Sequence, residues 1–306
     1  MRIGIDLGGT KIAAIALDDD GGVLATRRMA TPRGDYAATV AALAGLVGEI
    51  EDELAATGSV GVGIPGAISP ATGLVKNANS TWLIGRPLKE DLERALGREV
   101  RIENDANCFI VSEATDGAAR DARVAFGVIV GTGTGGGISI AGRSVTGINA
   151  IGGEWGHNPL PWPREDEIPG PACYCGKHAC IETFLSGPGL ARDYARRAGV
   201  ELDAAAIVAR AAAGEAVAEA ALARYEDRMA RALATVINLL DPEVIVLGGG
   251  MSNVERLYAN VPRRWQAYVF SDVVATQLRP PVHGDASGVR GAAWLWPAAG
   301  SVTGIT

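Results

Sequence analysis

The chain has 306 residues, of which 48% are hydrophobic and 21% charged, which is typical of one large or two medium globular domains and excludes a disordered or fibrous protein. A net charge of −7 without a Lys/Arg block argues against nucleic acid or an anionic membrane surface as the main partner. The first residues form a strand-like segment, so we expect neither a signal peptide nor an N-terminal helix-turn-helix. No apolar run is long enough to span a bilayer, and three of the four cysteines are clustered. We therefore expect a cytoplasmic protein.

The first third of the chain predicts strands followed by alternating helices and strands. Short apolar runs at 3–7, 11–17 and 23–29 are separated by glycine-rich turns, which predicts a three-stranded meander. The pattern then favours a helix at 36–56, a strand at 59–63, a helix at 87–96, a strand at 99–102 and a helix at 107–114. This order predicts a mixed sheet with helices packed against it.

The second half repeats the opening unit of strand, Gly/Thr turn and strand, here at 124–130, 131–137 and 138–141. Helices are expected at 183–197, 204–213, 216–240 and 289–296, with a strand at 244–247. Two such units roughly 125 residues apart predict two related lobes with a cleft between them. Ligand sites of α/β proteins commonly lie in such clefts.

The two glycine-rich turns have the composition of phosphate-binding loops. They read DLGGTK from Asp6 to Lys11 and GTGTG from Gly131 to Gly135. Glycines let backbone N–H groups approach phosphate oxygens, and threonine hydroxyls add donors. Either turn alone is compatible with a plain hairpin, but together, with Asp6 placed for a Mg²⁺-bound water and residues 248–250 available for adenosine, they favour a nucleotide.

A formal match to the dinucleotide fingerprint occurs at Gly131, Gly133 and Gly136. That fingerprint must open a helix. The residues that follow Gly136 alternate like a strand instead, so the pattern disfavours a dinucleotide-binding domain.

Asp105 is the best candidate for a general base. It follows a predicted strand and is flanked by Asn104 and Asn107. A carboxylate in this position can accept a hydroxyl proton during phosphoryl transfer to an alcohol, while a neighbouring amide fixes the substrate. The alternative is that Asp105 is a helix N-cap.

Residues 152–182 hold a cluster of Cys and His that predicts zinc. Cys173, Cys175 and Cys180 with one histidine supply a closed tetrahedral set, and His157 and His178 compete for the fourth place. A closed set has no open position for catalysis, so the metal would be structural. The alternative is three reduced thiols in a loop.

Two carboxylates, Glu154 and Glu182, bracket this cluster. Carboxylates accept hydrogen bonds from vicinal hydroxyls, which suits a neutral sugar, although both could simply be solvated. If one ring nitrogen of His157 binds zinc, its second N–H can reach a sugar hydroxyl.

Taken together, the motifs resemble the ROK sugar kinases, which have the hexokinase/actin-like ATPase fold. The matching pieces cover nearly the whole chain and begin at Asp6, Gly63, Glu103, Gly131, Gly152, Cys173 and Gly248: DLGGTK, GIPG, ENDAN, GTGTGGGI, GGEWGHNP, CYCGKHACIE and GGG. Within the family the chain is most similar to bacterial manno(fructo)kinases, through KNANSTW from Lys76, GEWGHNPLPW from Gly153, VLGGGMSNV from Val246 and HGDASGVRGAAWLWP from His283.

This resemblance implies ATP-dependent phosphorylation of a hexose at its 6-hydroxyl, with fructose expected first and mannose next. Alternatives within the same chemistry are a glucokinase and an N-acylhexosamine kinase. A sugar-sensing regulator is an alternative of a different class, because the family includes repressors. Family members are commonly homodimers, so a homodimer is also an expectation.

The resemblance also assigns roles by position. It implies that Asp105 is the base and contacts the sugar together with Asn104, Glu154, His157 and Glu182. It implies nucleotide contacts at Gly9, Thr10, Lys11, Thr132, Gly133 and Gly249, and a zinc set of His157, Cys173, Cys175 and Cys180. One departure is Ala179, which stands where the family has glycine; its Cβ is tolerated if φ is negative.

The implied fold is a two-lobed, actin-like and ribonuclease H-like α/β structure with an inserted zinc-binding loop at 157–180. Residues 1–108 and 287–306 would form the small lobe, and residues 109–286 the large lobe. Closure around the sugar would exclude water from ATP.

Overall fold

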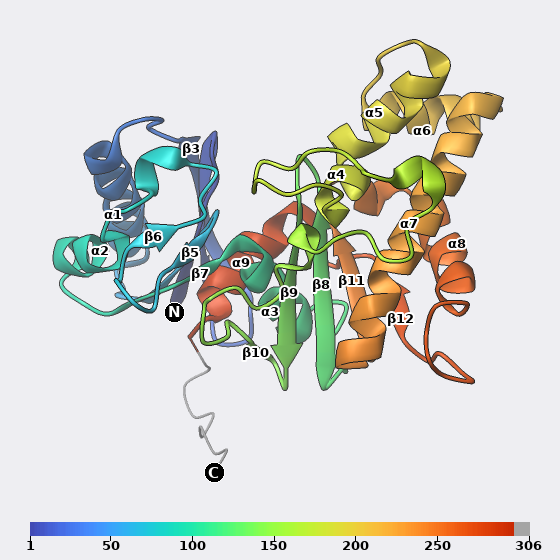
Figure 1. Cartoon of the computed structure of the whole chain (residues 1–306). Coiled ribbons are helices and arrows are strands. Elements are labelled where there is room, and N and C mark those ends of the chain that lie inside the picture. Colours follow the sequence, from blue (N-terminus) through green and yellow to red (C-terminus); the bar gives the residue numbers. More distant parts are fainter. Residues whose placement is uncertain (297–306) are drawn as a thin grey trace. The chain divides into compact units, whose positions relative to one another are not determined.

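The structure is a computed structural model that describes residues 1–296 (Figure 1). It divides into two compact units. Unit 1 comprises Met1–Arg120, Gly137–Gly152 and the described chain from Asp285 onward, and unit 2 comprises Asp121–Gly136 and Gly153–Gly284. Residue 108, the expected end of the small lobe, lies inside helix α3 (Asp105–Thr115). The tail from Pro297, expected in the small lobe, lies outside the described residues.

The sheet of unit 1 has the strand order β3-β2-β1-β4-β7. Its strands are β1 (Arg2–Leu7), β2 (Lys11–Leu17), β3 (Val23–Ala30), β4 (Ser59–Ile64) and β7 (Val100–Asn104). The first three form the predicted antiparallel meander, and β4 and β7 run parallel to β1. The mixed sheet expected from the order of the elements is therefore present.

Helices α1 (Tyr36–Leu54), α2 (Leu88–Leu96), α3 and α9 (Ser287–Trp294) accompany this sheet, with a small hairpin of β5 (Ala67–Ile68) and β6 (Val75–Lys76) and the turn η1 (Thr81–Leu83). Helix α9 approaches the strands closely, because a Cβ on Gly4 would lie 2.1 Å from the Val289 carbonyl oxygen. Glycine is therefore required where α9 crosses β1.

The second sheet has the order β10-β9-β8-β11-β12. Its strands are β8 (Val124–Val130), β9 (Thr134–Ile140), β10 (Arg143–Ser144), β11 (Val244–Gly248) and β12 (Gln277–Arg279). Strands β8, β11 and β12 are parallel. Strand β9 contains Gly136, which confirms that the glycine pattern opens a strand and not the helix that a dinucleotide fingerprint requires.

Outside its strands, unit 2 is largely helical. It holds α4 (Ile181–Leu185), α5 (Gly187–Ala198), α6 (Ala204–Ala212), α7 (Ala216–Leu240) and α8 (Arg256–Trp265), with the short helices η2 (Trp155–His157), η3 (Glu165–Glu167) and η4 (Gly250–Asn253), and η5 (Gly284–Ala286) precedes α9. The helix expected at 183–197 is two helices. Ser186 is extended between them and its Oγ accepts from the Gly189 N–H at 3.2 Å, which starts α5 anew.

Helix α7 matches its expected bounds, and its apolar face is buried at Tyr225, Met229, Leu233 and Val236. Such a face supplies most of the stability of a long helix through tertiary packing. Among the described residues, no helix is both long and apolar enough to cross a membrane.

Candidate active site

The turn between β1 and β2 presents its glycines with the backbone accessible. The Gly8 N–H donates to the Lys11 carbonyl at 3.0 Å, and the Thr31 hydroxyl donates to the Gly8 carbonyl at 2.8 Å. A Cβ placed on Gly9 would meet only the Ser80 Oγ, at 3.7 Å. The hydrogen bond from Thr31 therefore holds the turn in place, and the Gly9 backbone stays accessible to a ligand.

Three parallel strands of unit 1 end at the same edge, and two carboxylates share one row across them. Asp6 on β1 lies opposite Gly63 on β4, which lies opposite Glu103 on β7. Neighbouring strands are separated by about 4.8 Å, so the Cα atoms of Asp6 and Glu103 are about 10 Å apart. Burial raises the pKa of Asp6, and nearby Lys11 acts in the opposite direction. A cation beside this carboxylate would favour its ionised form.

Asp105 is the first residue of α3, directly after β7, and its side chain is exposed. The N-cap is Asn104, whose Oδ1 accepts from the Ala106 N–H at 2.9 Å while its Nδ2 donates to the Gly66 carbonyl at 3.1 Å. The alternative role for Asp105 as the N-cap is therefore taken by Asn104, although the Asp105 Oδ1 also accepts from the Ala106 N–H. The positive end of α3 stabilises the carboxylate that a general base needs.

Glu103 holds this junction together, a role that was not predicted from the sequence. Its Oε1 accepts from the Asn104 N–H at 2.9 Å and from the Asn107 Nδ2 at 3.1 Å, and its Oε2 accepts from the Thr146 hydroxyl at 2.5 Å. The same motif that places Asp105 thus supplies the carboxylate that orients its neighbours. The signal in the sequence for this role was the run of polar residues on either side of the exposed Asp105.

In unit 2, the turn after β8 is tied to a carboxylate from α4. Glu182 Oε2 accepts from the Thr134 N–H at 2.9 Å, and a Cβ on Gly133 would lie 2.6 Å from the same oxygen. The Gly187 N–H donates to the Gly131 carbonyl at 2.8 Å. Glycine at 133 is therefore required for Glu182 to reach the turn, and the turn is fixed by the start of α5.

Gly249 lies beside this turn. It follows β11, where Gly248 lies opposite Ile129 of β8, and it has φ 76° and ψ −176°, a conformation that is essentially restricted to glycine. A Cβ there would lie 2.4 Å from the Val130 carbonyl oxygen. The expected nucleotide contacts Thr132, Gly133 and Gly249 are thus neighbours at the carboxyl ends of two parallel strands, where α/β folds bind ligands.

Glu154 immediately precedes η2, and its neighbour Trp155 anchors that segment. The Trp155 Nε1–H donates to the Gly135 carbonyl at 3.1 Å, and its ring packs edge-on against Phe126 with centroids 5.8 Å apart. Trp155 therefore holds the backbone on either side of it, which carries the Glu154 and His157 side chains.

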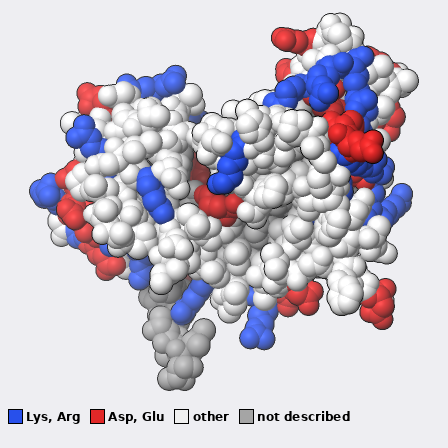
Figure 2. Space-filling model, in the orientation of Figure 1, with Lys and Arg blue, Asp and Glu red and all other residues white. Residues whose placement is uncertain are grey.

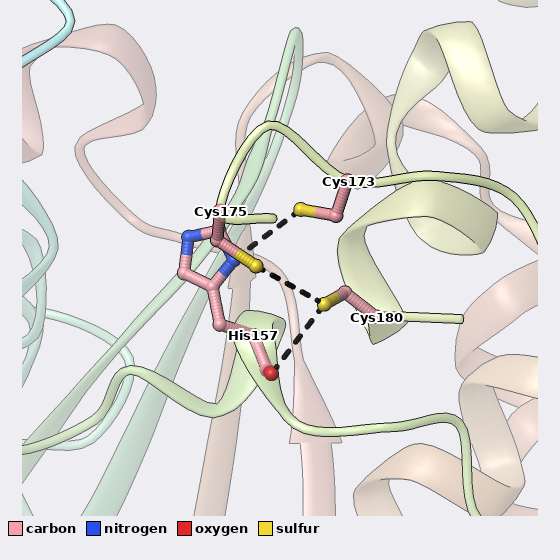
Figure 3. A group of neighbouring side chains, drawn as sticks. All are labelled: His157, Cys173, Cys175 and Cys180. Atoms are coloured by element: carbon pink, nitrogen blue, oxygen red, sulfur yellow. Dashed lines mark hydrogen bonds between the residues drawn. The ribbon is translucent and has the colours of Figure 1, made fainter. Parts of the chain in front are cut away.

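Figure 3 shows His157, Cys173, Cys175 and Cys180 gathered around one point, with their ligand atoms all within 4.8 Å of one another. His157 Nδ1 lies 3.6 Å from the Cys173 Sγ, and the Cys175 and Cys180 sulfurs lie 3.6 Å apart. With Zn–S near 2.3 Å and Zn–N near 2.05 Å, a tetrahedral site requires about 3.6 Å between S and N and about 3.8 Å between two sulfurs. The four side chains fit zinc. His178 is exposed and is not part of the group.

The thiols of this cluster differ in their acidity. The Lys177 backbone N–H, which points at the sulfur, lowers the pKa of Cys175 to about 7. Burial and the neighbouring sulfurs raise the pKa of Cys180 to about 12. A divalent cation at the centre would offset the cost of gathering three thiolates, since zinc binds the deprotonated form.

The second ring nitrogen of His157 has a protein partner. His157 Nε2 lies 3.0 Å from the Tyr174 hydroxyl, and the two rings meet edge-on at 87°. The sequence suggested a sugar hydroxyl at this nitrogen, and it gave Tyr174 no role. Burial raises the pKa of Tyr174 to about 12, and the charges of Glu182 and Glu154 act in the same direction.

Ala179, just before Cys180, does not have the negative φ under which its Cβ is tolerated. Its φ is +58°, in the left-handed region. An L-residue with a Cβ is strained there, which is why glycine suits the position. The Ala179 N–H donates to the Pro171 carbonyl at 2.9 Å, and this bond belongs to the turn that brings Cys180 back to Cys173.

Comparison with known proteins identifies the family. The model of the ROK family matches residues 2–299. The chain belongs to the ROK family. It is 40% identical over 299 residues to the N-acetyl-D-glucosamine kinase of Yersinia pseudotuberculosis, covering 96% of this chain and 98% of that protein. The N-acetyl-D-glucosamine kinase of Photobacterium profundum is also 40% identical, with 96% and 99% covered.

Solved structures agree on the fold. The ROK hexokinase from Thermus thermophilus superposes with a TM-score of 0.85 at 32% identity, covering 96% of each chain. The ROK glucokinase from Streptomyces griseus, solved with glucose and AMPPNP, has a TM-score of 0.77 at 27% identity, covering 96% of this chain and 98% of that one. The predicted hexokinase-type, actin-like α/β fold is confirmed, and this ROK protein is a sugar kinase. The relatives named here do not support fructose as its sugar.

Proposed function

We propose that this ROK kinase transfers the γ-phosphoryl group of ATP to the 6-hydroxyl of an N-acylhexosamine, with N-acetyl-D-glucosamine as the preferred substrate. The observation that carries the proposal is the 40% identity to an N-acetyl-D-glucosamine kinase along 98% of that protein's length. The first expectation from the sequence was fructose, and the alternative it kept open, an N-acylhexosamine kinase, now has the stronger support.

The chemistry assigned to unit 1 is proton removal. The Asp105 carboxylate accepts the proton of the 6-hydroxyl as that oxygen attacks the γ-phosphorus and the bond to the β-phosphate oxygen breaks, which releases ADP. Asn104 orients the same hydroxyl, with one of its amide protons used on Gly66. Transfer of this kind depends mostly on positioning and charge stabilisation, which suits a base that is fixed at the start of a helix.

The sugar contacts proposed for unit 2 are Glu154, His157 and Glu182. Glu182 has its Oε2 engaged by Thr134, so its Oε1 remains to accept a sugar hydroxyl. The His157 Nε2 is bonded to Tyr174, so either the phenol moves aside or it takes the sugar contact itself. Carboxylates that accept from vicinal hydroxyls discriminate strongly among sugars, because a missing partner leaves a buried acceptor unpaired.

Nucleotide contacts are proposed at Gly9, Thr10 and Lys11 in unit 1 and at Thr132, Gly133 and Gly249 in unit 2. Backbone N–H groups of such turns cradle phosphates. Asp6 would hold a Mg²⁺-bound water, and the ion would neutralise charge that develops on the phosphates. The zinc set of His157, Cys173, Cys175 and Cys180 would be structural, holding the loop that carries the sugar contacts.

The test is kcat/KM with ATP-Mg²⁺ for N-acetylglucosamine, N-acetylmannosamine, glucose, mannose and fructose. We expect N-acetylglucosamine to lead by at least tenfold, which corresponds to about 1.4 kcal/mol of differential transition-state binding. If fructose had the highest kcat/KM, the proposed substrate would be wrong, whereas the assignment as a sugar kinase would still hold.

A further inference from the structure

A cavity of about 280 Å³ lies in unit 2, and none of its lining residues is assigned to sugar, nucleotide or zinc. One wall is the loop at 166–171, and the opposite wall is the face of α5 that carries Arg192 and Arg196. Arg228 of α7 also lines the cavity. Three guanidinium groups therefore face one hollow, and the proposed function uses none of them.

Two of these arginines have no carboxylate partner in the described part of the chain. Arg192 donates to the Thr183 carbonyl oxygen, and Arg196 makes no side-chain bond or ion pair. They are four residues apart on α5 and so lie on the same face, one turn apart. Burial lowers the pKa of Arg192, the charges of Arg228 and Arg196 lower it further, and the charge of Asp193 acts in the opposite direction. A cation in that setting is stabilised by an anion.

The acids around the cavity are already neutralised by other arginines. Asp193 accepts from both Nε and Nη2 of Arg224 and from Nη1 of Arg228. Glu167 accepts from Arg228 and from Arg231, and all three side chains are buried. The remaining lining acid, Asp166, pairs with Arg197 at 2.8 Å. None of these carboxylates forms an ion pair with Arg192 or Arg196, although the charge of the adjacent Asp193 acts on Arg192.

The arginines of the cavity, together with the side chains connected to its lining by ion pairs, carry excess positive charge. This set holds seven arginines and four acids, an excess of three charges in a chain of net −7: Arg164, Arg192, Arg196, Arg197, Arg224, Arg228 and Arg231 against Asp166, Glu167, Asp193 and Asp227. Figure 2 shows Lys and Arg side chains gathered over the region of α5 and α6, with acids beside them.

Two further acids, Glu201 and Asp203, line a second hollow on the other side of the same arginines. Neither makes an ion pair with Arg192 or Arg196 in the described residues, and Asp203 Oδ1 instead accepts from the Ala206 N–H at 2.9 Å to cap α6. When both acids are included, the sum of the side-chain charges around α5 remains positive.

We propose that the cavity between α5 and the 166–171 loop is a binding site for a phosphate dianion, either free phosphate or the phosphoryl group of a small metabolite. Guanidinium forks bind phosphate oxygens in a bidentate manner, which favours this ligand over a monovalent anion. The loop wall ends at Pro171, whose carbonyl accepts from Ala179, and Cys173 follows two residues later. An anion held there stabilises the loop that leads into the zinc cluster.

The test titrates the full-length zinc-loaded protein with inorganic phosphate, and separately with N-acetylglucosamine 6-phosphate, by calorimetry and by thermal unfolding at constant ionic strength. The variants are Arg196→Gln and Arg192→Gln, and the matched control is Arg263→Gln, an exposed arginine of α8 without an ion pair among the described residues. Losing one charge-assisted hydrogen bond weakens binding by about 10- to 100-fold.

We expect saturating phosphate to raise Tm by about 2–4 °C in the wild type and in Arg263→Gln, and to raise it much less in Arg196→Gln. Because Arg196 makes no side-chain bond, this variant keeps the test valid even if Arg192→Gln fails to fold. Equal phosphate affinity in all four proteins, or an equal response to sodium chloride, would overturn the proposal. The ligand whose affinity falls more in Arg196→Gln than in Arg263→Gln is the better occupant of the cavity, because binding at the proposed active site does not involve Arg196.

Discussion

Glu182 and Thr134 are joined by a hydrogen bond of 2.9 Å from the Thr134 backbone N–H to the Glu182 Oε2. This bond connects a carboxylate proposed to bind sugar with the glycine turn proposed to bind nucleotide, both within unit 2. Because the partner is a backbone N–H, the geometry depends on the position of the turn and not on a side-chain rotamer. One carboxyl group can therefore respond to both ligands.

The first prediction separates the two roles of Glu182. In Glu182→Gln the amide oxygen can still accept from Thr134, so the turn should stay in place while a sugar acceptor is lost. In Glu182→Ala the Thr134 N–H loses its partner, at a cost of about 1–3 kcal/mol. Steady-state kinetics should show a higher KM for sugar in both variants and a higher KM for ATP only in Glu182→Ala. If ATP binding is unchanged in Glu182→Ala, the connection has no functional role.

The second prediction concerns the base. Asp105→Asn should lower kcat by about 10²- to 10⁴-fold, because an amide cannot accept the hydroxyl proton. Stability should change little, since Asn104 and not Asp105 caps α3, and a negative charge at a helix start contributes only about 0.3–1 kcal/mol. Sugar binding measured by calorimetry should persist. Turnover close to that of the wild type would remove Asp105 from the mechanism.

The third prediction concerns zinc. Elemental analysis should find about one zinc per chain, and a chelator should lower Tm and activity together, because structural zinc contributes on the order of 10 kcal/mol to local folding. His157→Ala should lose the metal, whereas His178→Ala, an exposed histidine of the same loop, should keep it. Equal zinc content in both variants would show that His157 is not a ligand.

Elements with a clear apolar period were predictable from the sequence. Strand β8 and helix α7 have the expected bounds, because alternation or three- and four-residue spacing runs to their ends. The break at Ser186 was missed because the residues on either side of it are helical, so periodicity alone does not show that a hydroxyl caps a new helix there.

The candidate site divides in the same way. Clustered types such as the three cysteines and His157 could be found, because metal ligands recur at short spacings. The contact of Glu103 with Thr146 and the contact of Tyr174 with His157 could not be found, since each joins residues that are distant in sequence. The positive φ of Ala179 was not predicted, because alanine itself favours a negative φ, and the glycine that the family has at this position was the signal for it.

That positive φ leads to the fourth prediction. Ala179→Gly should raise stability, because relief of a left-handed Cβ is worth about 1–2 kcal/mol while the added freedom of glycine in the unfolded chain costs about 0.4–1 kcal/mol. The matched control is Ala172→Gly in the same loop, whose φ is not positive and whose stability should therefore fall by about 0.4–1 kcal/mol. Denaturant unfolding of the zinc-loaded proteins measures both changes. Opposite signs for the two variants would show that the strain resides at residue 179, and a loss of stability in both would show that the loop does not impose it.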